Sequence, residues 1–213
     1  MLILTGPQGA GNHLWSKILS IHPKVYGWKS LLDNYWEAHR FAEPFCEHWR
    51  NTKLLDTFDW SQSEYYFTSI SCPLGIPGSD INPLWMPNII EFANAVCKNG
   101  VTVKIAVTGR DQTILNYQQT RVRSESTFHL FTEHMEEFDI TPIFLSYELL
   151  YLYKGDYLRS LDRTQVNIPI AWNDPRVNTI LEIDANEKYI HSIDTNPLDQ
   201  CNTTGVPLKT RPQ

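Results

Sequence analysis

The sequence has no excess of basic residues. It contains 18 Lys and Arg against 24 Asp and Glu in 213 residues, so its formal net charge is −6 at pH 7. Proteins that bind nucleic acid usually present a positive surface, because phosphate contacts supply much of the affinity. The composition therefore predicts no nucleic-acid partner, and an anionic small ligand would need a local positive site.

The sequence also has no long hydrophobic run. No stretch approaches the roughly 18 apolar residues of a membrane-spanning helix. Gly6, Pro7 and Gly9 interrupt the first apolar run, so the pattern of a secretory signal peptide is missing. We therefore expect a soluble, cytoplasmic protein without a membrane partner.

Cysteines are few and widely spaced. Cys46, Cys72, Cys97 and Cys201 form no C-x-x-C pair. Zinc sites and disulfide frameworks usually show closely spaced or regularly patterned cysteines. The sequence predicts neither, and no metal site is expected.

Strand and helix patterns alternate along the chain. The length suits one domain over residues 1–213, with a core of about residues 1–161 and a less regular C-terminal extension over residues 162–213. Alternating elements predict an α/β fold with a central parallel sheet flanked by helices, and ligands at the carboxyl ends of its strands. The expected strands are residues 1–5, 64–71, 101–109, 142–146 and 178–184; the expected helices are residues 11–20, 30–49 with a break near Pro44, 84–98, 111–123, 127–138 and 148–161.

A glycine-punctuated turn follows the first expected strand. Gly6 and Gly11 have the spacing of the Walker A motif, but Asn12 and His13 stand where a nucleotide-triphosphate binder has Lys and Ser or Thr. Glycines before a helix amino terminus allow backbone N–H groups to approach an anion. The turn therefore predicts a phosphate-binding loop, and the absent lysine disfavours phosphoryl transfer from ATP.

Four segments together resemble the sulfotransferase family, and the resemblance spans about residues 1–161. The loop and first helix are similar to the family's opening motif, and Tyr147 and Glu148 resemble its later Y-E-D-L corner. Arg110 ends a strand before a helix that carries Asn116, as in the family's middle motif. The four segments are QGAGNHLW (residues 8–15), ILSIHPKVYG (18–27), IAVTGRDQTILNYQQ (105–119) and PIFLSYELL (142–150).

The resemblance implies a three-layer P-loop-like fold and 3′-phosphoadenylyl sulfate (PAPS) as the sulfuryl donor. Arg110 and Asn116 would face its 3′-phosphate, and Lys17, one helical turn beyond His13, could lend charge to the same end. Guanidinium groups suit this role because they bind phosphate in a bidentate manner. The residues expected to hold the 5′-phosphosulfate are Gly9, Ala10, Gly11, Asn12 and His13.

Three residues are expected to be catalytic: His13, Glu37 and His39. Sulfuryl transfer needs a base for the acceptor hydroxyl, and Glu37 or His39 is the candidate, while His13 could donate to the leaving phosphate. His22 is expected to be a structural cap. The acceptor would be a small molecule or a carbohydrate, on which the many aromatic side chains could stack. Two alternatives remain open: a divergent nucleotide or nucleoside kinase, and a non-catalytic nucleotide-binding or structural protein on the same scaffold.

Overall fold

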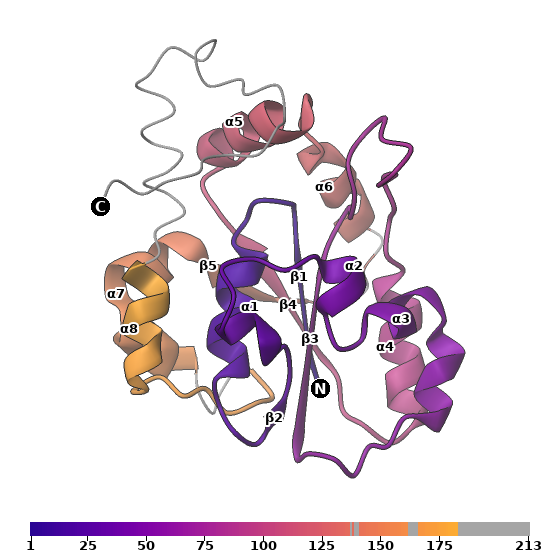
Figure 1. The fold of residues 1–213 in the computed structure, drawn as a ribbon, viewed down its shortest axis with the longest axis vertical. Helices are drawn as coiled ribbons and strands as arrows, with labels where there is room; N and C mark the ends of the chain where they lie inside the picture. Colours follow the sequence, from indigo (N-terminus) through magenta and orange to yellow (C-terminus); the bar gives the residue numbers. More distant parts are fainter. Residues whose placement is uncertain (137, 139–140, 162–165, 183–213) are drawn as a thin grey trace.

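A parallel sheet forms the centre of the molecule. The computed structural model describes residues 1–136, 138, 141–161 and 166–182. In this part of the chain a five-stranded sheet has the order β2-β3-β1-β4-β5, with every neighbouring pair parallel (Figure 1). The strands are β1 (Leu2–Gly6), β2 (Val25–Tyr26), β3 (Tyr65–Ser71), β4 (Lys104–Gly109) and β5 (Ile143–Ser146).

Helices cover both faces of the sheet, so the expected α/β class with flanking helices is confirmed. Leu2 and Leu4 of β1 pack with helices on one face, whereas Met1 and Ile3 pack on the other, as the two-residue period of a strand requires. The first layer contains α1 (Asn12–Ser20), α7 (Tyr147–Leu161) and α8 (Pro175–Glu182); the second contains α3 (Cys46–Arg50), the 3-10 helix η2 (Thr52–Thr57), α4 (Ile89–Lys98) and α6 (Phe128–Glu136).

The strand order creates a crevice beside β1. The chain leaves β1 toward β2 on one side of the sheet and leaves β4 toward β5 on the other. Ligand sites in open parallel sheets lie at such a switch point, beyond the carboxyl ends of the strands. The register aligns these ends, because Gly6 pairs with Ser71 of β3 and Thr5 pairs with Val107 of β4. Helix α5 (Gln112–Arg123) and α6 lie near this end of the sheet (Figure 1).

Most expected elements are present, but the region before β3 is more broken than the sequence predicts. Instead of one helical stretch over residues 30–49, it contains the 3-10 helix η1 (Ser30–Leu32), α2 (His39–Ala42) and α3. The short strand β2 was not expected. Helix α7 also has a non-helical residue at Lys154, with φ 47° and ψ −122°. Helix α4 ends as expected at Asn99–Gly100, where Gly100 takes a φ of 75°.

The expected strand over residues 178–184 is wrong. Residues 178–182 belong to α8, and residues 183 and 184 lie outside the described residues. The helix starts at an Asp-Pro pair: the Arg176 N–H donates to Asp174 Oδ1 at 2.9 Å, and Pro175 occupies the first helical position. The segment NTILE (residues 178–182) contains β-branched residues, which favour strands, but it follows a strong helix start. Val177, Ile180 and Leu181 pack in the core on one face of this helix.

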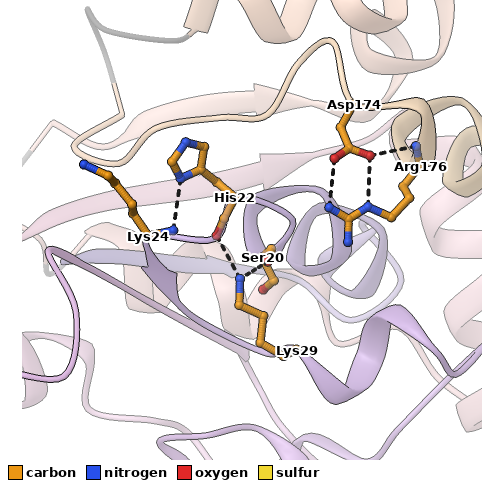
Figure 2. A network of polar contacts seen from close by, with 6 residues as sticks. All are labelled: Ser20, His22, Lys24, Lys29, Asp174 and Arg176. Atoms are coloured by element: carbon orange, nitrogen blue, oxygen red, sulfur yellow. Dashed lines mark hydrogen bonds and ion pairs between the residues drawn. The ribbon is translucent and has the colours of Figure 1, made fainter.

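The carboxyl end of α1 is capped by a lysine at the opposite end from the glycine turn (Figure 2). Lys29 Nζ donates to the carbonyls of Ser20 at 2.5 Å and His22 at 2.8 Å, which complements the negative end of the helix dipole. His22 Nδ1 accepts a hydrogen bond from the Lys24 N–H at 3.3 Å. His22 therefore has the structural role that the sequence predicts.

Helices in the described ranges are all too short or too polar to cross a membrane.

Loss of the α8 cap should destabilise the protein measurably. We expect Asp174→Ala to lower the free energy of unfolding by about 1 kcal/mol, the usual cost of a lost N-cap. Asp174→Asn keeps an oxygen acceptor and should cost less. Asp156, an exposed residue of α7, provides the control, and Asp156→Ala should change stability by less than about 0.5 kcal/mol. Urea unfolding measures all three, and an equal loss for Asn and Ala at position 174 would contradict the capping role.

Candidate functional site

The glycine loop, defined as residues 6–11, joins β1 to α1. Gly9 and Gly11 have φ values of 91° and 97°, which favour glycine. Gly11 caps α1 without a side-chain hydrogen bond. Among the described residues, the N–H groups of Asn12 and His13 have no hydrogen-bond acceptor. These donors at the positive end of α1 are suited to an anion.

The side chain of Asn12 connects the ends of three strands. Its Nδ2 donates to Ser71 Oγ of β3 at 2.9 Å and to the Gly6 carbonyl of β1 at 3.3 Å. Its Oδ1 accepts from Thr108 Oγ1 of β4 at 2.6 Å. Asn12, at the position of the Walker lysine, is thus a buried neutral side chain that binds three strand ends, and we call it the Asn12 clamp. It supplies no charge to a ligand.

Close packing leaves the loop little room to move. A Cβ on Gly6 would lie 2.1 Å from Thr108 Oγ1, and one on Gly11 would lie 2.5 Å from the Tyr147 ring. Gln8 Nε2 donates to the Gly75 carbonyl at 2.6 Å, so the segment after β3 holds the loop from another side. The Tyr147 ring therefore covers part of the loop.

Arg110 lies against the same loop, directly after β4. Its side chain is only 8% exposed, and Nη1 donates to the Gly9 carbonyl at 2.9 Å and to Gln118 Oε1 at 3.0 Å. Its guanidinium carbon lies 4.7 Å from the centre of the Tyr147 ring. The structure thus brings Arg110 to the glycine loop, whereas Asn116 is exposed on α5.

Two histidines meet on the β3 side of α1. The rings of His13 and His39 lie 4.5 Å apart, edge to face, and His13 also contacts Trp28 and Trp36 at 5.3 and 5.8 Å. His13 Nε2 donates to the Glu37 carbonyl at 2.6 Å, which leaves Nδ1 as the proton acceptor of the neutral ring. We call His13 and His39 the histidine pair.

Burial keeps the histidine pair neutral. The pKa of His13 is lowered to about 4, mainly by burial and also by Lys17, against the opposing effect of the hydrogen bond to the Glu37 carbonyl. Burial also lowers the pKa of His39 well below its ordinary value, with a contribution from His13. At pH 7 both rings are neutral, and burial opposes the protonation of either one. His13 therefore does not replace the positive charge of the missing loop lysine.

Glu37 and Lys17 flank the histidine pair in different ways. The Glu37 carboxylate accepts hydrogen bonds from Trp28 Nε1 at 2.7 Å, Ser30 Oγ at 2.6 Å and Asn34 Nδ2 at 2.8 Å. It fixes the segment that carries Trp28 and presents its backbone carbonyl to His13. Lys17 is 6% exposed, and burial lowers its pKa. The three predicted catalytic residues do come together, with Glu37 in a positioning arrangement.

Reasoning from the sequence missed the polar groups behind His39. Ser69 Oγ lies 3.1 Å from His39 Nε2, and the Ser69 N–H donates to Glu43 Oε1 at 3.3 Å. Glu43 Oε1 also accepts from Thr68 Oγ1 at 2.8 Å. Burial raises the pKa of Glu43 to about 8. The hydroxyls near the end of β3 were the available sequence signal, whereas Glu43 has no local pattern that marks it.

A cavity lies on the other side of the loop from the histidine pair. It has a volume of about 490 Å³ and is enclosed by the ends of β4 and β5, by α5 and by α6. Pro7 and Arg110 form its boundary with the glycine loop. The histidine pair and this cavity are thus two separate regions at one edge of the sheet.

Comparison of the chain with models of known families, with curated proteins and with solved structures finds no match. The described residues contain no cluster of three or more His, Cys, Asp or Glu side chains arranged to hold a metal ion.

Removal of the Asn12 side chain should destabilise the protein at the carboxyl ends of β1, β3 and β4. Asn12→Ala leaves Ser71 and Thr108 without this partner, and we expect a loss of about 2–3 kcal/mol in the free energy of unfolding. Asn116→Ala is the matched control on an exposed helix position, with an expected change below about 0.5 kcal/mol. Chemical denaturation distinguishes the two, and similar small losses would show that the clamp contributes little.

Glu43 should make the protein less stable as the pH rises. Its pKa in the folded protein is about 8, above its ordinary value of 4.5, so the folded state retains a proton that the unfolded state releases. Stability from this group is complete below pH 4.5 and is lost as the pH rises through 8, at up to about 1.4 kcal/mol per pH unit. Glu43→Gln should remove this component, as unfolding at pH 6.5, 7.5 and 8.5 would show. Parallel curves for the two proteins would contradict a protonated Glu43.

Proposed function

We propose that this chain is a P-loop-like, PAPS-dependent sulfotransferase that transfers a sulfuryl group to a hydroxyl of a small molecule or glycan. One observation carries the proposal. The unpaired N–H groups of Asn12 and His13, within the described residues, lie at the first turn of α1, and the His13 side chain on this turn contacts His39 of α2. An anion-binding amino terminus and a base are the two parts that sulfuryl transfer requires.

The residues fit one end of PAPS better than the other. The 5′-phosphosulfate suits the first turn of α1, where Gly9 and Gly11 allow close approach of the backbone. Arg110 adds positive charge beside Gly9 and is the candidate for the 3′-phosphate. Asn116 is exposed on α5 and is left out of the proposed site.

The proposed reaction uses the chain as a base and as an anion holder. A histidine of the pair accepts the proton of the acceptor hydroxyl, and the hydroxyl oxygen forms a bond to sulfur. The bond between sulfur and the bridging oxygen of the 5′-phosphate breaks, and this oxygen keeps the electron pair. The N–H groups of α1 stabilise the charge on the departing phosphate. The products are a sulfate ester and adenosine 3′,5′-bisphosphate.

A non-catalytic scaffold is the second candidate. The observation in its favour is the tight cover of the loop, where Tyr147 meets Gly11 and Gln118 lies 3.0 Å from a Cβ placed on Gly9. An ATP-dependent kinase receives less support, because Asn12 is committed to Gly6, Ser71 and Thr108 and offers no cation to a triphosphate.

Calorimetric titration with adenosine 3′,5′-bisphosphate tests the nucleotide site. We expect Arg110→Ala to weaken binding by about 10- to 100-fold, because a charged hydrogen bond is lost. Arg176 belongs to α8, and Figure 2 shows it with residues at the carboxyl end of α1, the end opposite the glycine loop. Arg176→Ala is therefore the control and should bind the bisphosphate as the wild type does. Failure of the wild-type protein to bind the bisphosphate at millimolar concentration would reject the nucleotide site.

Transfer of sulfate from PAPS to a panel of phenols, alkanols and sugars tests the chemistry. We expect His13→Gln to retain bisphosphate binding, since the backbone N–H remains, while transfer falls by about 10²- to 10⁴-fold. If the wild-type protein binds the bisphosphate but transfers sulfate to no member of this panel, the non-catalytic scaffold is the better description.

A further inference from the structure

Two aromatic side chains lie at the surface beside the histidine pair. Tyr35 is 59% exposed and Trp36 is 62% exposed, and both belong to the segment between η1 and α2. A single exposed aromatic residue is ordinary, whereas two consecutive rings next to a candidate site form a surface that a ligand can cover. We call Tyr35 and Trp36 the aromatic platform.

Contacts with α1 hold the platform in place. The Trp36 ring stacks on the His13 ring, with their centres 5.8 Å apart and an angle of 26° between their planes. Lys17 Nζ of the same helix lies 5.9 Å from the centre of the Tyr35 ring. Both platform residues are therefore positioned by α1 while more than half of each is open to water. A ligand that covers such fixed rings costs the protein little conformational entropy.

Polar groups with spare hydrogen-bonding capacity border the platform. The Lys17 ammonium, at the Tyr35 ring, makes no hydrogen bond in the part of the chain that the structure describes, and an ammonium has three N–H donors. Glu37 directly follows Trp36, and its Oε1 accepts from Asn34 Nδ2 at 2.8 Å and has a further lone pair. A ligand on the platform therefore meets an apolar surface with a donor and an acceptor at its margin.

These features match a neutral sugar ring better than a phenol. A pyranose ring has a face of C–H groups, which can pack on an aromatic ring, and a rim of hydroxyls, which needs donors and acceptors together. A small aromatic ligand is usually enclosed by a concave apolar site, whereas the platform is open. Lys17 and Glu37 carry opposite charges and lie close enough to interact, so together they favour neither an anion nor a cation.

We propose that the aromatic platform binds the ring of a neutral carbohydrate, with its hydroxyls at Lys17 and Glu37. As the site of the sulfate acceptor, the platform rests on the proposed function, since the stacking of Trp36 on His13 places the sugar beside the histidine pair. The acceptor is then a glycan rather than a phenol or an alkanol. Binding of the sugar itself requires no nucleotide, so it can be measured separately from sulfuryl transfer.

Calorimetric titration of the nucleotide-free protein with cellotetraose, chitotetraose and maltotetraose at millimolar concentration tests the inference. We expect at least one of these sugars to bind, and Trp36→Ala to weaken this binding at least tenfold because the stacking surface is lost. Trp36→Phe keeps a ring and should weaken it less than threefold. Tyr153→Ala is the matched control, because Tyr153 is 60% exposed on α7, outside the platform, and this variant should bind the sugar as the wild type does.

Circular dichroism would verify the fold of each variant, and Tyr35→Ala, expected to weaken the sugar at least threefold, covers the case in which Trp36→Ala does not fold. Three results would overturn the inference: no binding of any of the three sugars, wild-type affinity in the folded platform variants, or tighter binding of 2-naphthol than of any sugar at Trp36. Binding of the bisphosphate without any sugar would reject this inference alone. Sugar binding without any binding of the bisphosphate would leave the carbohydrate site standing and reject the nucleotide site alone.

Discussion

The hydrogen bonds of the Asn12 side chain hold together the carboxyl ends of the three central strands, at the end of the sheet where every candidate site lies. One amide joins the ends of β1, β3 and β4 through Gly6, Ser71 and Thr108. Buried hydrogen bonds of this kind fix geometry, because leaving any partner unpaired is costly. The clamp requires a short neutral side chain at position 12, and a lysine there could not make the same three contacts. The three contacts thus give a structural reason for asparagine at this position of the chain.

A consequence is that any anion at the loop must be bound by backbone N–H groups and by Arg110. The histidine pair does not add a cation, because burial lowers the pKa of both rings. Lys17 has a pKa lowered by the same cause. This arrangement suits a ligand with few charges better than a metal-bound triphosphate.

The sequence predicted four of the five strands and part of the site, and the reasons are local. The buried run of β1 followed by glycines predicted the β1–α1 unit, and Asn99–Gly100 predicted the end of α4. Residues 178–182 were predicted as a strand because their β-branched residues favour strands, whereas the helix start at Asp174–Pro175 was not recognised. His13, Glu37 and His39, which the sequence marks as catalytic candidates, lie together in the structure: the two rings are in contact, and His13 donates to the Glu37 carbonyl.

The remaining parts of the site depend on contacts between distant segments. Glu43 reaches Ser69 from across 26 residues, and Arg110 reaches Gly9 from across 101. No local period or motif encodes such pairings, and the resemblance placed Arg110 toward a phosphate without its bond to the loop carbonyl. Arg110 therefore has two neighbours at once, the glycine loop and the apolar cavity. Both lie at the end of β4, so the same guanidinium binds the Gly9 carbonyl of the loop and forms part of the cavity wall.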